Sequence, residues 1–172
     1  MLETYKQLIA NQFDAALCML DSCVERCPDA IWNSPVANLK FCQVAFHALF
    51  FADYYLGPPD DDSFRRQPFH RENPHIFRDY EELEDRVQVL LYDKPAIKAY
   101  LGHCRKQALQ VIAAETEESL AAPCGFARKH FSRAELNVLN IRHIQHHAAQ
   151  LSLRLRLDAH DGVPWVASGW RE

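Results

Sequence analysis

Apolar side chains recur at three- and four-residue spacing along most of the chain, which is the pattern of amphipathic helices. The first such stretch runs from Leu2 to Cys27 and is ended by Pro28. Its apolar positions lie on one face of a helix: Leu8, Ile9, Phe13, Ala16, Leu17, Leu20 and Val24. We therefore predict one long N-terminal helix that buries this face.

A second long helix is expected from about Pro35 to Leu56, just before the sequence Gly57-Pro58-Pro59. Ser34 is a residue type that caps helices, and proline suits the first helical turn. The stretch is apolar on nearly all sides, which is typical of a buried helix. The positions that make it so are Phe41, Val44, Phe46, Leu49, Phe50, Phe51 and Tyr54. We expect it to be the most buried element.

Two further long helices are expected in the second half of the chain. Asp93 can cap a helix that has proline in its first turn and runs to about Glu118. Ser132 and Glu135 have the spacing of a capping box, in which each side chain accepts from the other residue's backbone N–H. The helix that they begin should run to about Leu157.

The remaining segments connect or follow these helices. Residues 60–78 are polar, aromatic and broken by proline, and they predict a long loop; residues 79–91 have a helix-like pattern. Residues 158–172 form a tail whose Trp165 and Trp170 should pack back onto the helices. The prediction is an all-α fold of one domain over all 172 residues. It is a four-helix bundle with a long loop and a short helix between the second and third long helices.

Composition narrows the classes of protein that this chain can belong to. It is 48% apolar and 24% charged, which is typical of a soluble globular protein. A net charge of −4 argues against broad nucleic-acid binding, which needs a basic surface. The longest strongly apolar segment, residues 44–56, is shorter than the roughly 20 residues that cross a bilayer. We therefore expect neither a nucleic-acid nor a membrane partner.

The cysteines and the start of the chain indicate a cytoplasmic protein. The first residues contain no basic stretch followed by an apolar one, as a secretion signal would. No two cysteines have C-x-x-C spacing, so reduced thiols are a better interpretation than a structural zinc site. The six are Cys18, Cys23, Cys27, Cys42, Cys104 and Cys124.

Histidines supply the candidate chemistry. His143 and His147 are four residues apart on the last predicted helix, so their side chains share a face and can reach one metal ion. His146 points about 100° away from His147. His47 lies in the most apolar helix, where an imidazole needs a partner to offset the loss of its hydration. Facing helices of a bundle can bring such residues together. We predict a site of His47, His143 and His147.

Other interpretations of the histidines remain open at this stage. A lone histidine on an apolar helix is often a core residue bonded to a carbonyl or hydroxyl, and pairs spaced by four arise by chance. No H-E-x-x-H motif indicates a zinc protease, and the one Glu-x-x-His sequence, residues 72–75, contains a proline. The other isolated histidines are most simply structural or solvated: His70, His75, His103, His130 and His160.

The order of these features resembles the DinB-like (YfiT-like) superfamily of metalloenzymes. The sequence "FHALFFADYYL" places His47 deep in the second helix, and "HIQHHAAQLSLRLR" is close to the family pattern H-x-x-x-H-R-G-Q. The match assigns His47, His143 and His147 to the ligand positions and Gln150 to the glutamine. The chain departs from the pattern where Ala148 and Ala149 replace Arg-Gly, which weakens any inference of an anion site beside the metal.

The resemblance implies a divalent metal in a four-helix bundle, commonly as a homodimer. It implies one ion per chain, with zinc or nickel favoured, although nitrogen ligands alone do not distinguish these from cobalt or iron. Three imidazole ligands leave a position for water or substrate, and the ion lowers the pKa of a water or thiol bound there. Gln150 and Asp53 are candidates for contacting the ligands from outside. Members include thiol transferases that use bacillithiol or mycothiol, and a mycothiol-dependent maleylpyruvate isomerase.

Three classes of function follow. The first is a metal-dependent transferase of the thiol S-transferase type, or a hydrolase, acting on a small electrophilic substrate with a low-molecular-weight thiol as a possible co-substrate. The second is a dimeric metal-binding protein without turnover, acting in stress response. The third is a metal-free helical protein with structural histidines.

The loop of residues 60–78 is expected to border the metal and to influence substrate choice. Aromatic side chains could form an apolar wall, and arginines could meet an anionic substrate. The aromatic candidates are Phe64, Phe69 and Phe77, and the arginines are Arg65, Arg66 and Arg71. The alternative is a solvated connection whose aromatic residues only cover the surface of the helices.

Overall fold

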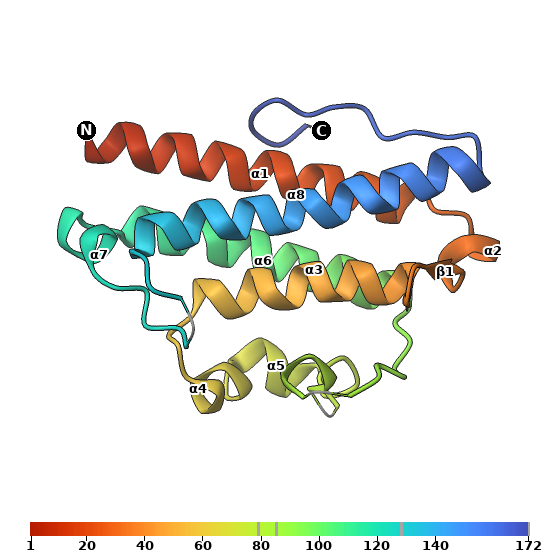
Figure 1. The fold of residues 1–172 in the computed structure, drawn as a ribbon, viewed down its shortest axis with the longest axis horizontal. Coiled ribbons are helices and arrows are strands. Elements are labelled where there is room, and N and C mark those ends of the chain that lie inside the picture. Colours follow the sequence, from red (N-terminus) through yellow and green to blue (C-terminus); the bar gives the residue numbers. More distant parts are fainter. Residues whose placement is uncertain (79, 85, 128, 172) are drawn as a thin grey trace.

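Four long helices pack side by side and contain most of the core (Figure 1). A computed structural model describes residues 1–78, 80–84, 86–127 and 129–171. The long helices are α1 (Leu2–Arg26), α3 (Phe41–Leu56), α6 (Lys94–Ala114) and α8 (Arg133–Asp158). The short elements are α2 (Asp29–Trp32), β1 (Pro35–Val36), β2 (Leu39–Lys40), α4 (Asp61–Arg65), α5 (Pro68–Glu72), η1 (Glu81–Leu83) and α7 (Glu117–Ala121). The predicted all-α class is confirmed, because the strands of the described residues are only two residues long.

The directions of the long helices explain why one connection is long. In Figure 1, α1 and α8 run one way while α3 and α6 run the other. Because α3 and α6 are parallel neighbours, the chain between them must return along the whole of α3. For sixteen residues at about 1.5 Å each, that is about 24 Å. Residues 57–93, here named the return segment, cover this distance along the outer side of α3 (Figure 1).

Helix α3 is the most enclosed of the four, as its all-round apolar pattern predicts. Twelve of its sixteen residues are buried. The four others are His47, Phe51, Tyr54 and Tyr55, whose spacing places them along one stripe of the helix. Along this stripe the side chains of α3 are only partly buried, and one of them is the predicted metal ligand His47.

The predicted start of this helix was wrong. Residues 35–36 pair with residues 39–40 as a small antiparallel ladder, and Ala37 adopts a left-handed conformation (φ 54°) in the turn between them. The helix begins only at Phe41, because the side chain of Gln43 accepts a hydrogen bond from the backbone N–H of Lys40 (2.9 Å). Ser34 therefore does not cap α3.

The return segment also differs from the prediction. Residues 60–78 contain α4 and α5, and Asp60 caps α4 by accepting the N–H groups of Asp62 and Ser63. In the described part of residues 79–91 the helix-like pattern gives only the short turn η1, followed by chain without regular secondary structure. The buried carboxylate of Glu81 accepts the N–H groups of Val89 and Leu90, which are therefore not free to join a helix. Asp79 and Asp85 lie outside the described residues.

The other helix ends follow from their caps. Asp93 accepts the N–H of Ala96 (2.8 Å) and Ser132 accepts that of Glu135 (3.3 Å), so α6 and α8 begin where predicted. Among the described residues only this half of the predicted capping box forms, because the side chain of Glu135 does not bond back to Ser132. Helix α6 ends at Ala114 rather than near Glu118. The reason is that Thr116 caps the separate short helix α7.

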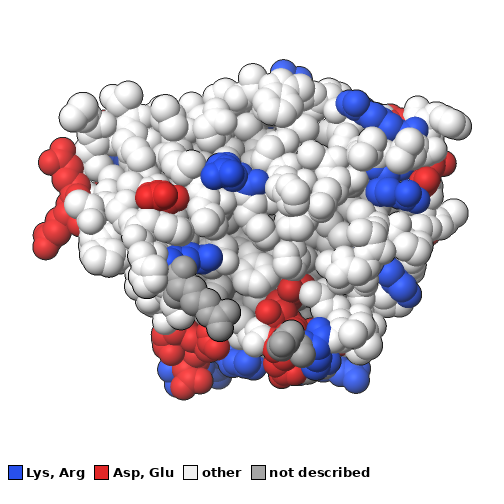
Figure 2. Space-filling view, viewed as in Figure 1, with Lys and Arg blue, Asp and Glu red and all other residues white. Residues whose placement is uncertain are grey.

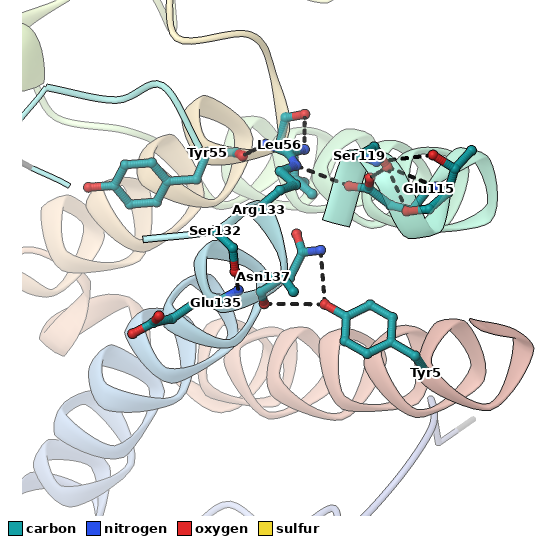
Figure 3. Close-up of polar contacts among 11 residues, drawn as sticks. Tyr5, Tyr55, Leu56, Glu115, Ser119, Ser132, Arg133, Glu135 and Asn137 are labelled. Carbon is teal, nitrogen blue, oxygen red and sulfur yellow. Dashed lines mark hydrogen bonds and ion pairs between the residues drawn. The ribbon is translucent and has the colours of Figure 1, made fainter. Parts of the chain in front are cut away.

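Arg133 joins three helices at one end of the molecule (Figure 3). Its guanidinium donates to the carbonyl oxygens of Tyr55 (2.8 Å) and Leu56 (2.9 Å), the last residues of α3. Its Nε also donates to the buried carboxylate of Glu115, just after α6 (3.0 Å). Farther along α8, Asn140 donates to the carbonyl oxygen of Ala52 (2.9 Å). These contacts fix the register of α8 against α3.

The C-terminal tail lies along α1, but only one of its two tryptophans packs as predicted. Gly169 donates its backbone N–H to the carbonyl oxygen of Asn11 (3.0 Å). Trp170 packs against the core and beneath the guanidinium of Arg105, 4.2 Å from the ring centroid. Trp165 is 65% exposed, so the prediction that it packs on the helices was wrong.

All six cysteines are unpaired and buried. Burial raises the pKa of Cys23 to about 12 and that of Cys27 to about 11. It also raises the pKa of Cys104 well above its usual value. These three groups are therefore protonated thiols at neutral pH. Among the described residues, no helix is long and apolar enough to cross a membrane.

Asp53 holds the return segment against α3 through a buried polar cluster. Its carboxylate accepts hydrogen bonds from Gln67 (3.0 Å) and Tyr100 (2.9 Å), and it lies 2.8 Å from Nε2 of His70. Nε2 of His103 is 3.7 Å away. Burial alone would raise the pKa of Asp53, but the imidazoles of His103 and His70 outweigh burial and lower this pKa to about 2.

We predict that the variant Asp53→Asn loses a pH-dependent part of the folding stability. Because the pKa is lower in the folded protein than its usual value of 3.8, ionised Asp53 stabilises the fold above about pH 4, and this contribution disappears as the pH falls towards 2. The shift corresponds to about 2 kcal/mol. Urea unfolding of both proteins at several pH values should therefore give a difference in unfolding free energy that is about 2 kcal/mol smaller at pH 2 than at pH 6. A difference that stays constant over this range would contradict the prediction.

Candidate metal centre

The three predicted histidines meet between α3 and α8. Nε2 of His143 lies 3.3 Å from Nε2 of His47 and 3.1 Å from Nε2 of His147. One nitrogen of each ring falls within 4.8 Å of the other two, a spacing that can hold a metal ion. The one-turn spacing in α8 aligns two of the rings, and the register of α8 against α3 brings the third opposite them.

The outer nitrogens of two of these rings are already bonded. Nδ1 of His47 lies 2.8 Å from Oε2 of Glu82, and Nδ1 of His147 lies 2.9 Å from Oε1 of Gln150. Carboxylate and amide oxygens only accept hydrogen bonds, so both Nδ1 atoms carry hydrogen. In the neutral rings the Nε2 atoms of His47 and His147 are then lone-pair acceptors that point towards His143.

Hydrogen bonds among the three rings cannot satisfy this arrangement. Neutral His143 has one N–H, so it can donate to only one of the two neighbouring Nε2 acceptors. A cation among the three nitrogens would satisfy all of them. Two nitrogens at about 2.0–2.1 Å from a tetrahedral zinc ion lie about 3.3 Å apart, close to the two separations that involve Nε2 of His143. The residues therefore fit a metal ion.

Burial keeps the two candidate ligand rings of α8 neutral. Burial, together with the neighbouring rings of His147 and His47, lowers the pKa of His143 to about 3. Burial and His47 likewise lower the pKa of His147 to about 4. Neutral imidazole is the form that binds metals, so no proton has to leave these two rings at neutral pH.

The other predicted site residues divide into two groups. Gln150 contacts the ring of His147, a candidate ligand, and His146 stays outside the three-histidine group, with Nε2 3.1 Å from the amide nitrogen of Gln150. Asp53 was wrongly expected beside the ligands. It lies on another side of α3, where His70 and Tyr100 occupy its carboxylate.

Sequence reasoning missed Glu82. Its carboxylate is almost fully buried and bonds to His47, although the two residues belong to different segments, 35 positions apart. The sequence contains a weak signal, because Glu81 and Glu82 are adjacent acids in a stretch with helix-like spacing. Nothing in that pattern tells which of the two would turn towards α3.

The expected role of residues 60–78 is not found in the contacts of the described chain. Phe64 and Phe77 are buried and Phe69 is partly buried, and all three pack around the Asp53 cluster rather than the three histidines. The guanidinium of Arg65 lies over the ring of Tyr80. The return segment reaches the histidines later along the chain, at Glu82. Phe51 of α3 supplies the aromatic contact instead, with its ring 4.9 Å from His47 and 5.6 Å from His143.

A surface groove of about 780 Å³ lies over α8 and the adjoining part of α1, and one of the three histidines, His143, forms part of its lining. Apolar groups and cations share the rest of the wall, among them Tyr55, Leu139, Trp165, Lys129 and Arg142. In Figure 2, charged side chains gather over the return segment and at the ends of the molecule, whereas few lie on the surface over α8. The groove has the mixed character of a site for a small molecule.

Comparison with protein families identifies the class of this protein. The family model described as DinB superfamily matches residues 12–151, which include all three histidines. The chain therefore belongs to the DinB superfamily, as its sequence resemblance predicts. Comparison with curated proteins and with solved structures gave no match.

Proposed function

We propose that this chain is a metal-dependent transferase of the thiol S-transferase type, or a hydrolase, that acts on a small electrophilic substrate. His47, His143 and His147 would bind one divalent ion per chain, zinc or nickel. The observation that carries the proposal is that Nε2 of His143 lies 3.3 Å from Nε2 of His47 and 3.1 Å from Nε2 of His147, an arrangement that hydrogen bonds alone leave unsatisfied. Membership of the DinB superfamily supports it.

The chain's own residues would each have a separate part. When bound, the ion supplies an electrophilic centre with at least one coordination position that the protein leaves open. Gln150 holds the ring of His147, and Phe51 shields the ligand rings from water. Lys129 and Arg142 would attract an anionic group of the substrate or thiol into the groove. Among the described residues, neither cation forms an ion pair with a carboxylate.

The groove favours an enzyme over a metal-binding protein without turnover. A site that only stores or senses a metal needs no space for a second molecule, whereas this groove has room for one and is lined by His143. Its mixture of aromatic and cationic side chains suits a substrate with an apolar part and a negative charge. A low-molecular-weight thiol could occupy the same groove.

We predict about one equivalent of divalent metal per chain in protein purified without a histidine tag, measured by elemental analysis. His147→Ala removes one of three ligands and should weaken zinc binding by more than the roughly 100-fold that loss of an outer hydrogen-bond partner can cause. His146→Ala is the matched control, because its ring neighbours His147 but lies outside the group. Equal zinc affinity in the two variants would show that the metal is not bound by these histidines.

Turnover separates the two leading functions. Metal-loaded protein is incubated with monochlorobimane and a panel of thiols, and formation of the fluorescent thioether is followed. We expect thiol-dependent turnover that is lost in His147→Ala and retained in His75→Ala, whose exposed imidazole lies outside both the groove and the three-histidine group. Ester substrates with coloured leaving groups test the hydrolase form of the proposal. Normal metal binding without turnover of either kind would instead favour the metal-binding protein without catalysis.

We further propose a cytoplasmic, single-domain four-helix bundle of the DinB/YfiT type that forms a homodimer. Exposed apolar side chains of α8 support the dimer: Val138, Leu153 and Leu157. A closed two-fold interface is the commonest way to cover such a surface. Light scattering should give the mass of two chains at micromolar concentration, and Leu153→Glu should lower it towards one. A wild-type mass near one chain at these concentrations would rule out the dimer.

A further inference from the structure

Glu82 is a buried carboxylate whose one side-chain partner among the described residues is His47. Its side chain is only 3% exposed, and Oε2 accepts from Nδ1 of His47 at 2.8 Å. Oε1 is also buried and has no hydrogen-bond partner among the described residues. A buried carboxylate is costly unless it is paired, so the contact with His47 is what offsets the burial of Glu82.

The neighbours of Glu82 hold it in place independently of His47. Glu81 accepts the N–H groups of Val89 and Leu90 and the guanidinium of Arg86. On the other side, Tyr80 adopts a left-handed conformation (φ 52°), and its hydroxyl lies 3.1 Å from Nδ1 of His70 in the Asp53 cluster. The backbone on both sides of Glu82 is therefore fixed by contacts that do not involve the three histidines.

We propose that Glu82 is a positioning residue that prepares His47 to bind the metal, an inference that rests on the metal site proposed above. By accepting the Nδ1 hydrogen, the carboxylate keeps that hydrogen off Nε2 and fixes the ring's rotation. The Nε2 lone pair is then directed towards Nε2 of His143. Carboxylates that bond to the outer nitrogen of a ligand histidine also raise its basicity, which strengthens the metal bond. The return segment thereby contributes to a site whose ligands all lie on α3 and α8.

The variant Glu82→Gln tests this role through metal affinity. It keeps the size of the side chain and removes its charge. We expect its dissociation constant for zinc, measured by competition with a chromophoric chelator, to rise about 10- to 100-fold. Glu84→Gln is the matched control, because Glu84 lies in the same segment but is half exposed and pairs with Arg86. Its affinity should stay within about twofold of the wild type, since this residue has no contact with the ligands.

A role in folding alone would give a different result. It would lower the thermal stability of metal-free Glu82→Gln and leave zinc affinity within about twofold of the wild type in the folded variant, and that outcome would overturn the proposal. Failure of the wild-type protein to bind zinc would instead overturn the metal site itself. The two hypotheses can thus fail separately.

The tautomer of His47 gives a second test that needs no folded variant. Long-range ¹H–¹⁵N correlation spectra of the metal-free wild-type protein at neutral pH distinguish a hydrogen on Nδ1 from one on Nε2. We expect the hydrogen of His47 on Nδ1, bonded to Glu82, and the same tautomer after zinc is added. A hydrogen on Nε2 in the metal-free protein, or zinc bound through Nδ1, would overturn the proposal even if Glu82→Gln did not fold.

Discussion

The anchorage of α8 to the end of α3 by Arg133 is the constraint on which the candidate site depends. Arg133 donates to the last carbonyl groups of α3, and His143 follows ten residues later, or about 15 Å along the helix. His47 precedes Leu56 by nine residues, or about 13.5 Å, on the antiparallel partner. The two distances nearly match, so the anchor places His143 opposite His47. A slip of one turn would separate the rings by about 5.4 Å.

The same anchor connects the site to the rest of the fold. Arg133 is bonded to Glu115, which fixes the end of α6, while Asn140 adds a buried contact to α3 between the anchor and the histidines. Polar groups buried in this way are costly when one partner is lost, because the other is left without a hydrogen bond. The register is therefore defined by a few directional contacts, and the apolar surfaces of α3 and α8 pack around it.

The three histidines could be predicted from the sequence, but their surroundings could not. Helical spacing brings His143 and His147 together, and the apolar surroundings of His47 indicate that it needs a partner. Glu82 has no such signature, because its position depends on the path of the return segment along α3. The long helices were predictable because their apolar residues recur at the three- and four-residue spacing of a helix. The start of α3 and residues 79–91 were not, because single side chains, Gln43 and Glu81, compete there with the local pattern by binding backbone N–H groups.

The burial of the cysteines has a consequence for the proposed function, in which the protein would meet reactive electrophiles. Alkylation requires a thiolate that the reagent can reach. All six side chains are buried, and the raised pKa values of Cys23, Cys27 and Cys104 keep these three protonated. A substrate that reacts readily with a small activated thiol would therefore meet poor nucleophiles in the protein itself. If the proposed activity is present, the packing that forms the core would also protect the chain from alkylation by its own substrate.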